Sequence, residues 1–303
     1  MLHLTKLREL NLLSASDPSR PAYISAASGL VTAGDHLYVV ADDELFLGAF
    51  ALHGDAPGKL LRVIPGELPE KKKERKKYKP DFEVLLRLPT FAQYKYGALL
   101  AMGSGSTDRR YRAVLLPLGA QGEVEGALRI IEASAFYKVL THHFEELNLE
   151  GGWVQDNELR LLQRGNKEHS TNAVIHIELQ TVLACLNAGD ELPAIKPSTI
   201  QVDLGRIDKV PLCFSDGCAL PDGRWMFTAV AEDTDSAYED GECVGAAIGM
   251  VSADNTLLWI KQVTPSYKIE GIEAQQKADG IHLLLVTDAD DIKVPSVLLS
   301  AVV

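Results

Sequence analysis

Short apolar runs separated by polar turns recur along the whole chain, and they recur in groups. Each group opens with a small or acidic residue, often followed by glycine, and continues with an apolar strand, a turn and a second apolar strand ending in polar residues. Apolar runs of this length, bounded by turn residues, are typical of β-strands. Five groups can be distinguished by their openings: Ser28-Gly29, Asp81-Phe82-Glu83, Leu149-Glu150-Gly151, Ser215-Asp216-Gly217 and Ile269-Glu270-Gly271.

The spacing of these groups indicates a repeat architecture. The leading residues 28, 83, 150, 216 and 270 are separated by 55, 67, 66 and 54 residues, somewhat longer than familiar propeller blades and consistent with long loops. Further strand-like runs follow in the first four groups, at 45–52 and 59–64, 111–118 and 127–131, 172–179 and 199–204, and 245–252 and 256–263. We therefore predict an all-β protein, a five-bladed β-propeller forming a single domain over residues 1–303, with six blades as the alternative.

The fifth group lacks one strand, because only residues 295–303 follow its first two. Residues 2–10 are a suitable donor, since they carry Leu2, Leu4 and Leu10 in near alternation. Pairing this N-terminal strand beside the last strands would close the ring and remove an open sheet edge. Two segments, 134–147 and 180–188, instead space their apolar residues as helices do, and we expect small helical insertions that cover blade edges.

Composition narrows the classes of function. The formal charge is −12 and the pI is about 5.2, which argues against a nucleic-acid-binding protein because such proteins need a basic face. No apolar run approaches the roughly 18 residues of a spanning helix, and charges interrupt the first ten residues, so we expect no membrane partner and a cytoplasmic location. Four cysteines are too few for a disulfide framework and are expected to be reduced thiols.

Topology predicts where a site would lie. In a propeller the first strand of each blade lines the central channel, so the leading residues should meet at its mouth. Converging carboxylates repel one another, and a bound hard cation, protonation or pairing with arginine and lysine can relieve this repulsion. Ca²⁺ accepts six to eight oxygen ligands with loose geometry. A channel calcium site is one interpretation, with backbone amides and channel water solvating the acids as the other. The predicted metal ligands are Glu83, Glu150, Asp216 and Glu270.

The ends of the second strands bring further polar groups to the same rim. Asp288 and Glu232 are candidate catalytic residues, because a carboxylate beside a metal-bound water can take its proton. The run 71–79 (KKKERKKYK) carries a formal charge of +6 and is either a solvated loop or a basic flap that holds a phosphate-bearing ligand. The candidate ligand-binding residues are Arg164, Lys79, Asn166, Asp42 and Asp290.

Several motifs resemble those of an uncharacterised bacterial β-propeller family. They are the strand starts "NLEGGW", "KIEGIEA" and "KPDFE" and the strand ends "VTDADD" and "AVAEDTD". More distantly, the chain is similar to phytase-like esterase and SdiA-regulated propellers, which also open inner strands with Glu-Gly. This resemblance implies calcium-assisted hydrolysis of a phosphoester or ester. The first repeat departs from the pattern with Ser28 in place of an acid, and no general base matches the family's.

Two hypotheses of different classes follow. The first is a metal-dependent hydrolase of a small phosphorylated or ester substrate. The second is a non-enzymatic propeller that binds a ligand or a protein, and the basic run favours an anionic ligand. The pairing of Arg164 distinguishes a ligand-binding role of the channel mouth from a structural one. A free guanidinium favours binding of an anion, whereas pairing with Glu150 or Asp216 favours a structural role.

Overall fold

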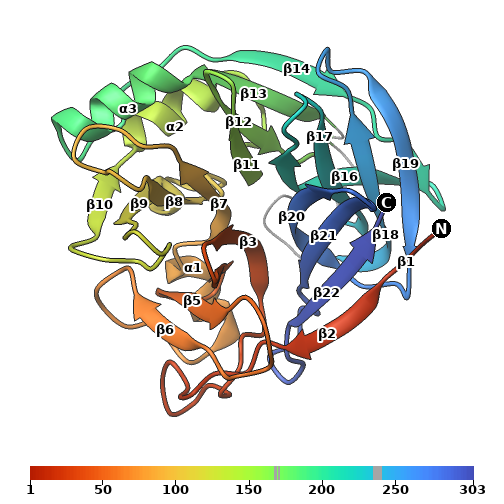
Figure 1. The fold of residues 1–303 in the computed structure, drawn as a ribbon, viewed down its shortest axis with the longest axis horizontal. Coiled ribbons are helices and arrows are strands. Elements are labelled where there is room, and N and C mark those ends of the chain that lie inside the picture. Colours follow the sequence, from red (N-terminus) through yellow and green to blue (C-terminus); the bar gives the residue numbers. More distant parts are fainter. Residues whose placement is uncertain (167–168, 170, 235–240) are drawn as a thin grey trace.

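The computed structural model describes residues 1–166, 169, 171–234 and 241–303. Over this part of the chain the strands form five sheets arranged in a ring, which confirms the five-bladed propeller (Figure 1). The inner strands contact one another in the order β3, β7, β11, β16 and β20, and β20 returns to β3. All pairs of consecutive strands within a blade are antiparallel.

Each blade is a four-stranded meander, with small additions to the fourth. The first two are β3 (Ala27–Ala33), β4 (His36–Ala41), β5 (Phe46–Ala51) and β6 (Lys59–Arg62), then β7 (Phe82–Leu88), β8 (Ala98–Gly103), β9 (Arg112–Pro117) and β10 (Arg129–Glu132). The third is β11 (Leu149–Gln155), β12 (Glu158–Gln163), β13 (Asn172–Glu178) and β14 (Ser198–Val202). The fourth is β16 (Val210–Ala219), β17 (Trp225–Asp233), β18 (Glu242–Val251) and β19 (Leu257–Thr264), with β15 (Arg206–Ile207) beside β16.

The N-terminal segment closes the ring, as predicted, but it does so with two strands rather than one. The fifth blade consists of β20 (Ile269–Lys277), β21 (Gly280–Thr287), β22 (Val297–Val302) and β2 (Thr5–Glu9), and β2 pairs antiparallel with β22. The preceding β1 (Leu2–His3) pairs parallel with β19 of the fourth blade (Figure 1). The N-terminal segment therefore joins blades four and five, because β2 supplies the outer strand of the fifth sheet and β1 extends the fourth.

Two of the helices cover the outside of blades two and three. Helix α2 (Ser134–Leu140) and helix α3 (Leu179–Ala188) bury one face each among strands of those blades. In α3 the buried residues are Leu179, Val182, Leu183 and Leu186, the spacing of one helical face. The helix predicted over 134–147 thus ends earlier, at Leu140. No helix of the described ranges is long and apolar enough to cross a membrane.

The third helix was not predicted. Residues Lys72–Tyr78 of the basic run form α1, whereas we expected a solvated loop or a flap. Lysine, arginine and glutamate are strong helix formers, and Arg75 is buried, so one face of this charged segment is anchored to the protein. Lys76 and Lys79 of this run line the cavity at the channel mouth.

The closure gives a test of the fold. Leu10 follows β2, is fully buried beside Val286 and Leu298, and donates its backbone N–H to Ser296 O at 2.9 Å. Leu7, within β2, is 50% exposed. We expect Leu10→Ala to lower the free energy of unfolding by about 2–5 kcal/mol, because it leaves a cavity in the closing blade. Leu7→Ala should change it by less than about 0.5 kcal/mol.

Urea unfolding of both variants measures this difference. Deletion of residues 1–12 should destabilise the protein more than Leu10→Ala does. An equal effect of the two leucine substitutions, or a neutral deletion, would contradict the closure.

Candidate functional site

The inner strands share a local irregularity, which lies at the start of four of them and in the middle of β16. In each, the register with the second strand shifts and leaves one extra residue, which is a β-bulge. A bulge bends the strand and redirects one side chain, and here it repeats around the ring. The extra residues are Ser28, Glu83, Glu150, Ser215 and Glu270.

The Glu-Gly pattern of the sequence follows from how closely neighbouring inner strands approach after the bulge. A Cβ on Gly151 would lie 2.4 Å from Asp216 Oδ1 and 2.7 Å from its Cα. A Cβ on Gly271 would lie 3.1 Å from the Cα of Gly29 in the next blade. Because side chains do not fit at these two positions, the bulged acid is followed by glycine.

The mouth of the channel holds a cavity of about 90 Å³, enough for an ion and a few waters but below the size of a typical organic ligand site. With the exception of Asp216, every residue predicted for the site lines this cavity. They are Asp42, Lys79, Glu83, Glu150, Arg164, Asn166, Glu232, Glu270, Asp288 and Asp290.

Asp216 lies one position beyond the bulge, which Ser215 occupies in the fourth blade. Its two carboxylate oxygens accept the backbone N–H groups of Gly217 at 2.7 Å and Ile272 at 2.9 Å. The sequence alignment of the repeats was therefore wrong by one residue in this blade. Ser215 matches Ser28 instead, since each hydroxyl donates to the backbone carbonyl that precedes the bulge of an adjacent blade, Ile269 O and Phe82 O respectively.

Arg164 lies among three carboxylates and neutralises much of one side of the mouth. Its guanidinium is 3.3 Å from Glu150 Oε2 and 3.7 Å from Glu270 Oε2, and it donates a hydrogen bond to Glu232 Oε2. Its side chain is only 10% exposed. Of the two outcomes considered for this residue, pairing is the one observed, and it favours a structural role for the guanidinium.

A second cation, Lys268, completes this side. Its ammonium lies 3.4 Å from both Glu232 Oε1 and Glu270 Oε1 and 2.8 Å from Asp290 Oδ1. Lys268 was missed in the sequence, although its place two residues before the bulged Glu270 was a usable signal. Glu150, Glu232, Glu270 and Asp290 are thus each bonded to a buried cation.

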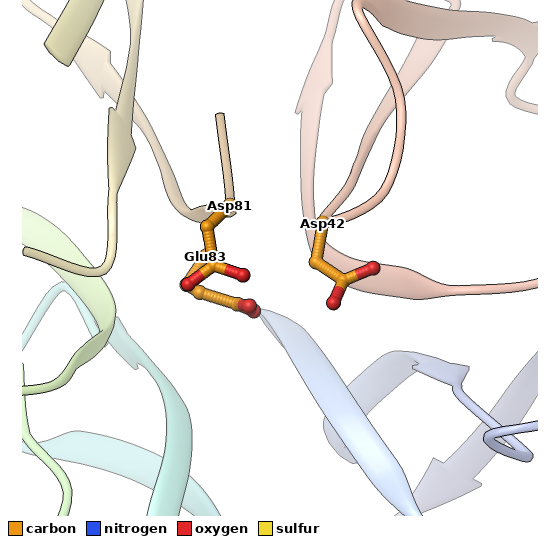
Figure 2. Close-up of side chains that lie close together, drawn as sticks. All are labelled: Asp42, Asp81 and Glu83. Carbon is orange, nitrogen blue, oxygen red and sulfur yellow. The ribbon is translucent and has the colours of Figure 1, made fainter. Parts of the chain in front are cut away.

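The opposite side of the mouth is built from blades one and two. Asp42 follows β4, and Asp81 and Glu83 flank the start of β7. Ligand oxygens of these three carboxylates all lie within 4.8 Å of one another, and their carboxyl groups face a shared space (Figure 2). Lys79 bonds to Asp42 and lies 2.8 Å from Asp81 Oδ1, while Arg110 Nη1 is 2.6 Å from Asp81 Oδ2.

Glu83 differs from the other acids of the mouth. Within the described part of the chain, its carboxylate makes no hydrogen bond and no ion pair shorter than 4.0 Å. Asp81 and Arg110, which line the same cavity, were not predicted from the sequence. Asp81 adopts a left-handed backbone conformation (φ 56°), and Ser104 N–H donates to its carbonyl at 2.8 Å. Such conformations are costly for residues other than glycine and concentrate at functional sites.

Negative charge is in excess at the mouth. Among the described residues lining the cavity, eight carboxylates face five cationic side chains. Burial, together with neighbouring carboxylates, raises the pKa of Glu150 to about 8 and that of Asp42 to about 6, although Arg164 and Lys79 respectively oppose these shifts. The same causes raise the pKa values of Glu83 and Asp288 well above the usual range. Protonation or a bound cation would relieve the excess.

Comparison with known proteins gives a family but no activity. A model described as "Family of unknown function (DUF6929)" matches residues 23–303. No protein of curated function matches the sequence. Among solved structures, the WD40 β-propeller domain of Doa1 is 11% identical with a TM-score of 0.38, over 92% of this chain and 94% of that one.

Two further solved structures are matched over only part of their own length. The β-propeller domain of Cps50 (Swd1) from Myceliophteria thermophila is 8% identical with a TM-score of 0.37, over 87% of this chain and 62% of that one. A quinohemoprotein alcohol dehydrogenase from Comamonas testosteroni is 8% identical with a TM-score of 0.36, over 94% of this chain and 42% of that one. This chain therefore spans less than two thirds of either, and likeness at these levels carries no argument about function.

The raised pKa of Glu150 makes stability depend on pH in a defined direction. A carboxyl group that binds its proton more tightly when folded destabilises the protein as pH rises from the unfolded pKa, near 4.5, to the folded pKa, near 8. Between pH 5 and pH 8, Glu150→Gln should therefore flatten the fall in unfolding free energy, by up to about 1.4 kcal/mol per pH unit.

Urea unfolding at several pH values, on the wild type and the variant, measures the two slopes. Glu125→Gln is the matched control, because Glu125 is exposed and makes no ion pair within the described residues, so its slope should equal that of the wild type. Equal slopes for all three proteins would show that Glu150 does not carry a proton in the folded state.

Proposed function

The chain belongs to the DUF6929 family of unknown function, so its role has to be argued from its own residues, and we propose that it is a ligand-binding propeller whose channel mouth takes a hard divalent cation. The proposed ligands are Asp42, Asp81 and Glu83, and the proposed cation is Ca²⁺. The observation that carries this proposal is the convergence of three carboxylates within 4.8 Å, one of which, Glu83, has no ion-pair partner in the described chain.

The chemistry of these groups suits calcium. Ca²⁺ binds carboxylate and carbonyl oxygens at about 2.3–2.6 Å, so two of its ligands on opposite sides are separated by about 5 Å. Carboxylates within 4.8 Å of one another can therefore reach one ion with small side-chain movements. The cavity of about 90 Å³ leaves room for waters to fill the remaining coordination positions.

This set differs from the one predicted at the sequence level, in which the acids of four blades surround the ion. Glu150 is bonded to Arg164, Glu270 forms longer ion pairs with Arg164 and Lys268, and Asp216 accepts two backbone N–H groups. An ion among those three would have to compete with these cations and backbone donors. Only Glu83 belongs to both sets.

Binding is favoured over hydrolysis by the state of the candidate bases. Glu232 is bonded to Arg164 through Oε2 and lies 3.4 Å from Lys268 through Oε1, so both of its carboxylate oxygens already face cations. Asp288 lines the cavity, but its Oδ1 accepts the backbone N–H of Asp290 at 2.7 Å. The Glu-Gly strand starts, which resemble those of phytase-like esterase propellers, agree with a bound cation but supply no base.

A small anion is the proposed second ligand. A cavity of about 270 Å³ adjoins the mouth, α1 forms part of its wall, and Asp42, Lys79 and Asp288 line both spaces. A phosphate- or carboxylate-bearing molecule in this cavity could complete the coordination of the cation. The cation would offset the repulsion between this anion and the surrounding carboxylates. Lys72 and Lys76 of α1 belong to the same wall and would attract such a ligand.

Calcium titration tests the proposal. We expect Ca²⁺ to raise the melting temperature of the wild type, because a ligand that binds only the folded state stabilises it. Glu83→Gln should abolish the increase, and Glu150→Gln should preserve it, since Glu150 is bonded to Arg164 instead. Isothermal titration calorimetry gives the affinities directly.

Three results would contradict the proposal. No change in melting temperature at millimolar Ca²⁺ would remove the cation. Loss of binding in Glu150→Gln but not in Glu83→Gln would favour the ring of bulged acids. Turnover of a panel of phosphoesters and lactones, dependent on Ca²⁺, would replace binding with hydrolysis.

A further inference from the structure

Lys79 places its ammonium group between two of the three proposed cation ligands. It follows α1, bonds to Asp42 Oδ2 and lies 2.8 Å from Asp81 Oδ1, and its side chain is 10% exposed. One positive charge therefore already occupies part of the space in which the cation would bind. The ammonium and a divalent cation cannot both stay there, because like charges at about 3 Å in a buried site repel strongly.

The backbone of Lys79 is fixed, while its side chain has somewhere to move. Its N–H donates to Arg75 O at 2.8 Å, and the buried Arg75 donates to Asp43 O at 2.8 Å, which anchors α1 to the first blade. Lys79 also lines the adjoining cavity of about 270 Å³, where Asp288 and Asp290 belong to the wall. A flexible lysine stem can carry the ammonium toward these acids without moving the helix.

Arg110, the other cation of this cluster, is held differently. Its guanidinium lies 2.6 Å from Asp81 Oδ2, is 5% exposed and also bonds Ser106. A planar guanidinium with several donors to fixed partners loses more than a single ammonium when it leaves. Of the two, Lys79 is the exchangeable one.

A separate observation indicates that the mouth lacks positive charge even with Lys79 in place. Glu270 Oε2 is buried and accepts no hydrogen bond, and Arg164 Nη1 lies 3.7 Å from it. Glu270 is 5% exposed and lines the same cavity. A buried carboxylate oxygen without a donor is costly, so additional positive charge at the mouth would be stabilising.

We propose that Lys79 is a tethered counter-ion that occupies the cation site when the site holds no metal and is displaced toward Asp288 and Asp290 when a divalent cation binds. The inference rests on the proposed function, since it concerns the same site. It assigns Lys79 two roles: it weakens the affinity for Ca²⁺ by competition, and it keeps Asp42 and Asp81 compensated in the absence of the ion.

The test is a calcium titration of four proteins by calorimetry and thermal melting. They are the wild type, Lys79→Gln, Lys79→Arg and, as a matched control in the preceding helix α1, Lys77→Gln, where the Lys77 side chain is 54% exposed. Lys79→Gln should bind Ca²⁺ at least about tenfold more tightly, because the competing charge is gone. Lys79→Arg should bind no more tightly than the wild type, and Lys77→Gln should bind equally.

Lys79→Gln should also melt at a lower temperature than the wild type without calcium and gain more from calcium. If it binds Ca²⁺ with wild-type or weaker affinity, competition by Lys79 is overturned while the proposed cation site stands. If neither the wild type nor Lys79→Gln binds Ca²⁺, the proposed function fails and the inference with it. A Lys79→Gln protein that is unfolded at every calcium concentration would also overturn the inference, because the cation would then not replace the lysine.

Discussion

Closing five sheets into a ring forces one segment of each inner strand into a narrow space, and the charges brought there have to balance. A β-bulge in each of these segments redirects one side chain, and in blades three and five the close packing around the following glycine leaves no room for another. Three of the five redirected side chains are glutamates. Carboxylates in a buried space are tolerated only when cations, protons or donors compensate them, so this requirement governs the remainder of the mouth.

The carboxylates are compensated unevenly around the channel, and this difference indicates where a ligand would bind. On the side of blades three to five, Arg164 and Lys268 together contact four carboxylates. Removing one member of such a buried network typically costs about 3–5 kcal/mol, because the others are left unpaired. On the side of blades one and two, Glu83 has no ion pair within the described residues. A ligand gains most where the protein has left a charge unbalanced, so we place the cation there.

The fold was predictable because it depends on a pattern that repeats. Apolar runs, turns and the spacing of the five strand starts indicate blades, and residues 2–10 alternate as a closing strand must. Convergence of the site residues followed from topology alone, without knowledge of any contact. The position of a bulge does not show in an apolar pattern, which is why Asp216 was aligned in place of Ser215. Pairing was equally hidden: the partners of Arg164 come from blades three, four and five, and Arg110 lies on a one-turn 3₁₀ helix with no motif around it.

The choice between arginine and lysine separates the permanent charges of the mouth from the exchangeable one. Arg164 and Arg110 use several donors of a planar group, so each fixes the carboxylates around it in a defined geometry. Lys268 has an ammonium group but contacts three carboxylates, so its removal would destabilise the mouth strongly. Lys79 contacts two, and both belong to the cluster that a divalent ion would claim. An ion that replaces Lys79 therefore brings two positive charges in place of one and leaves the arginine framework intact.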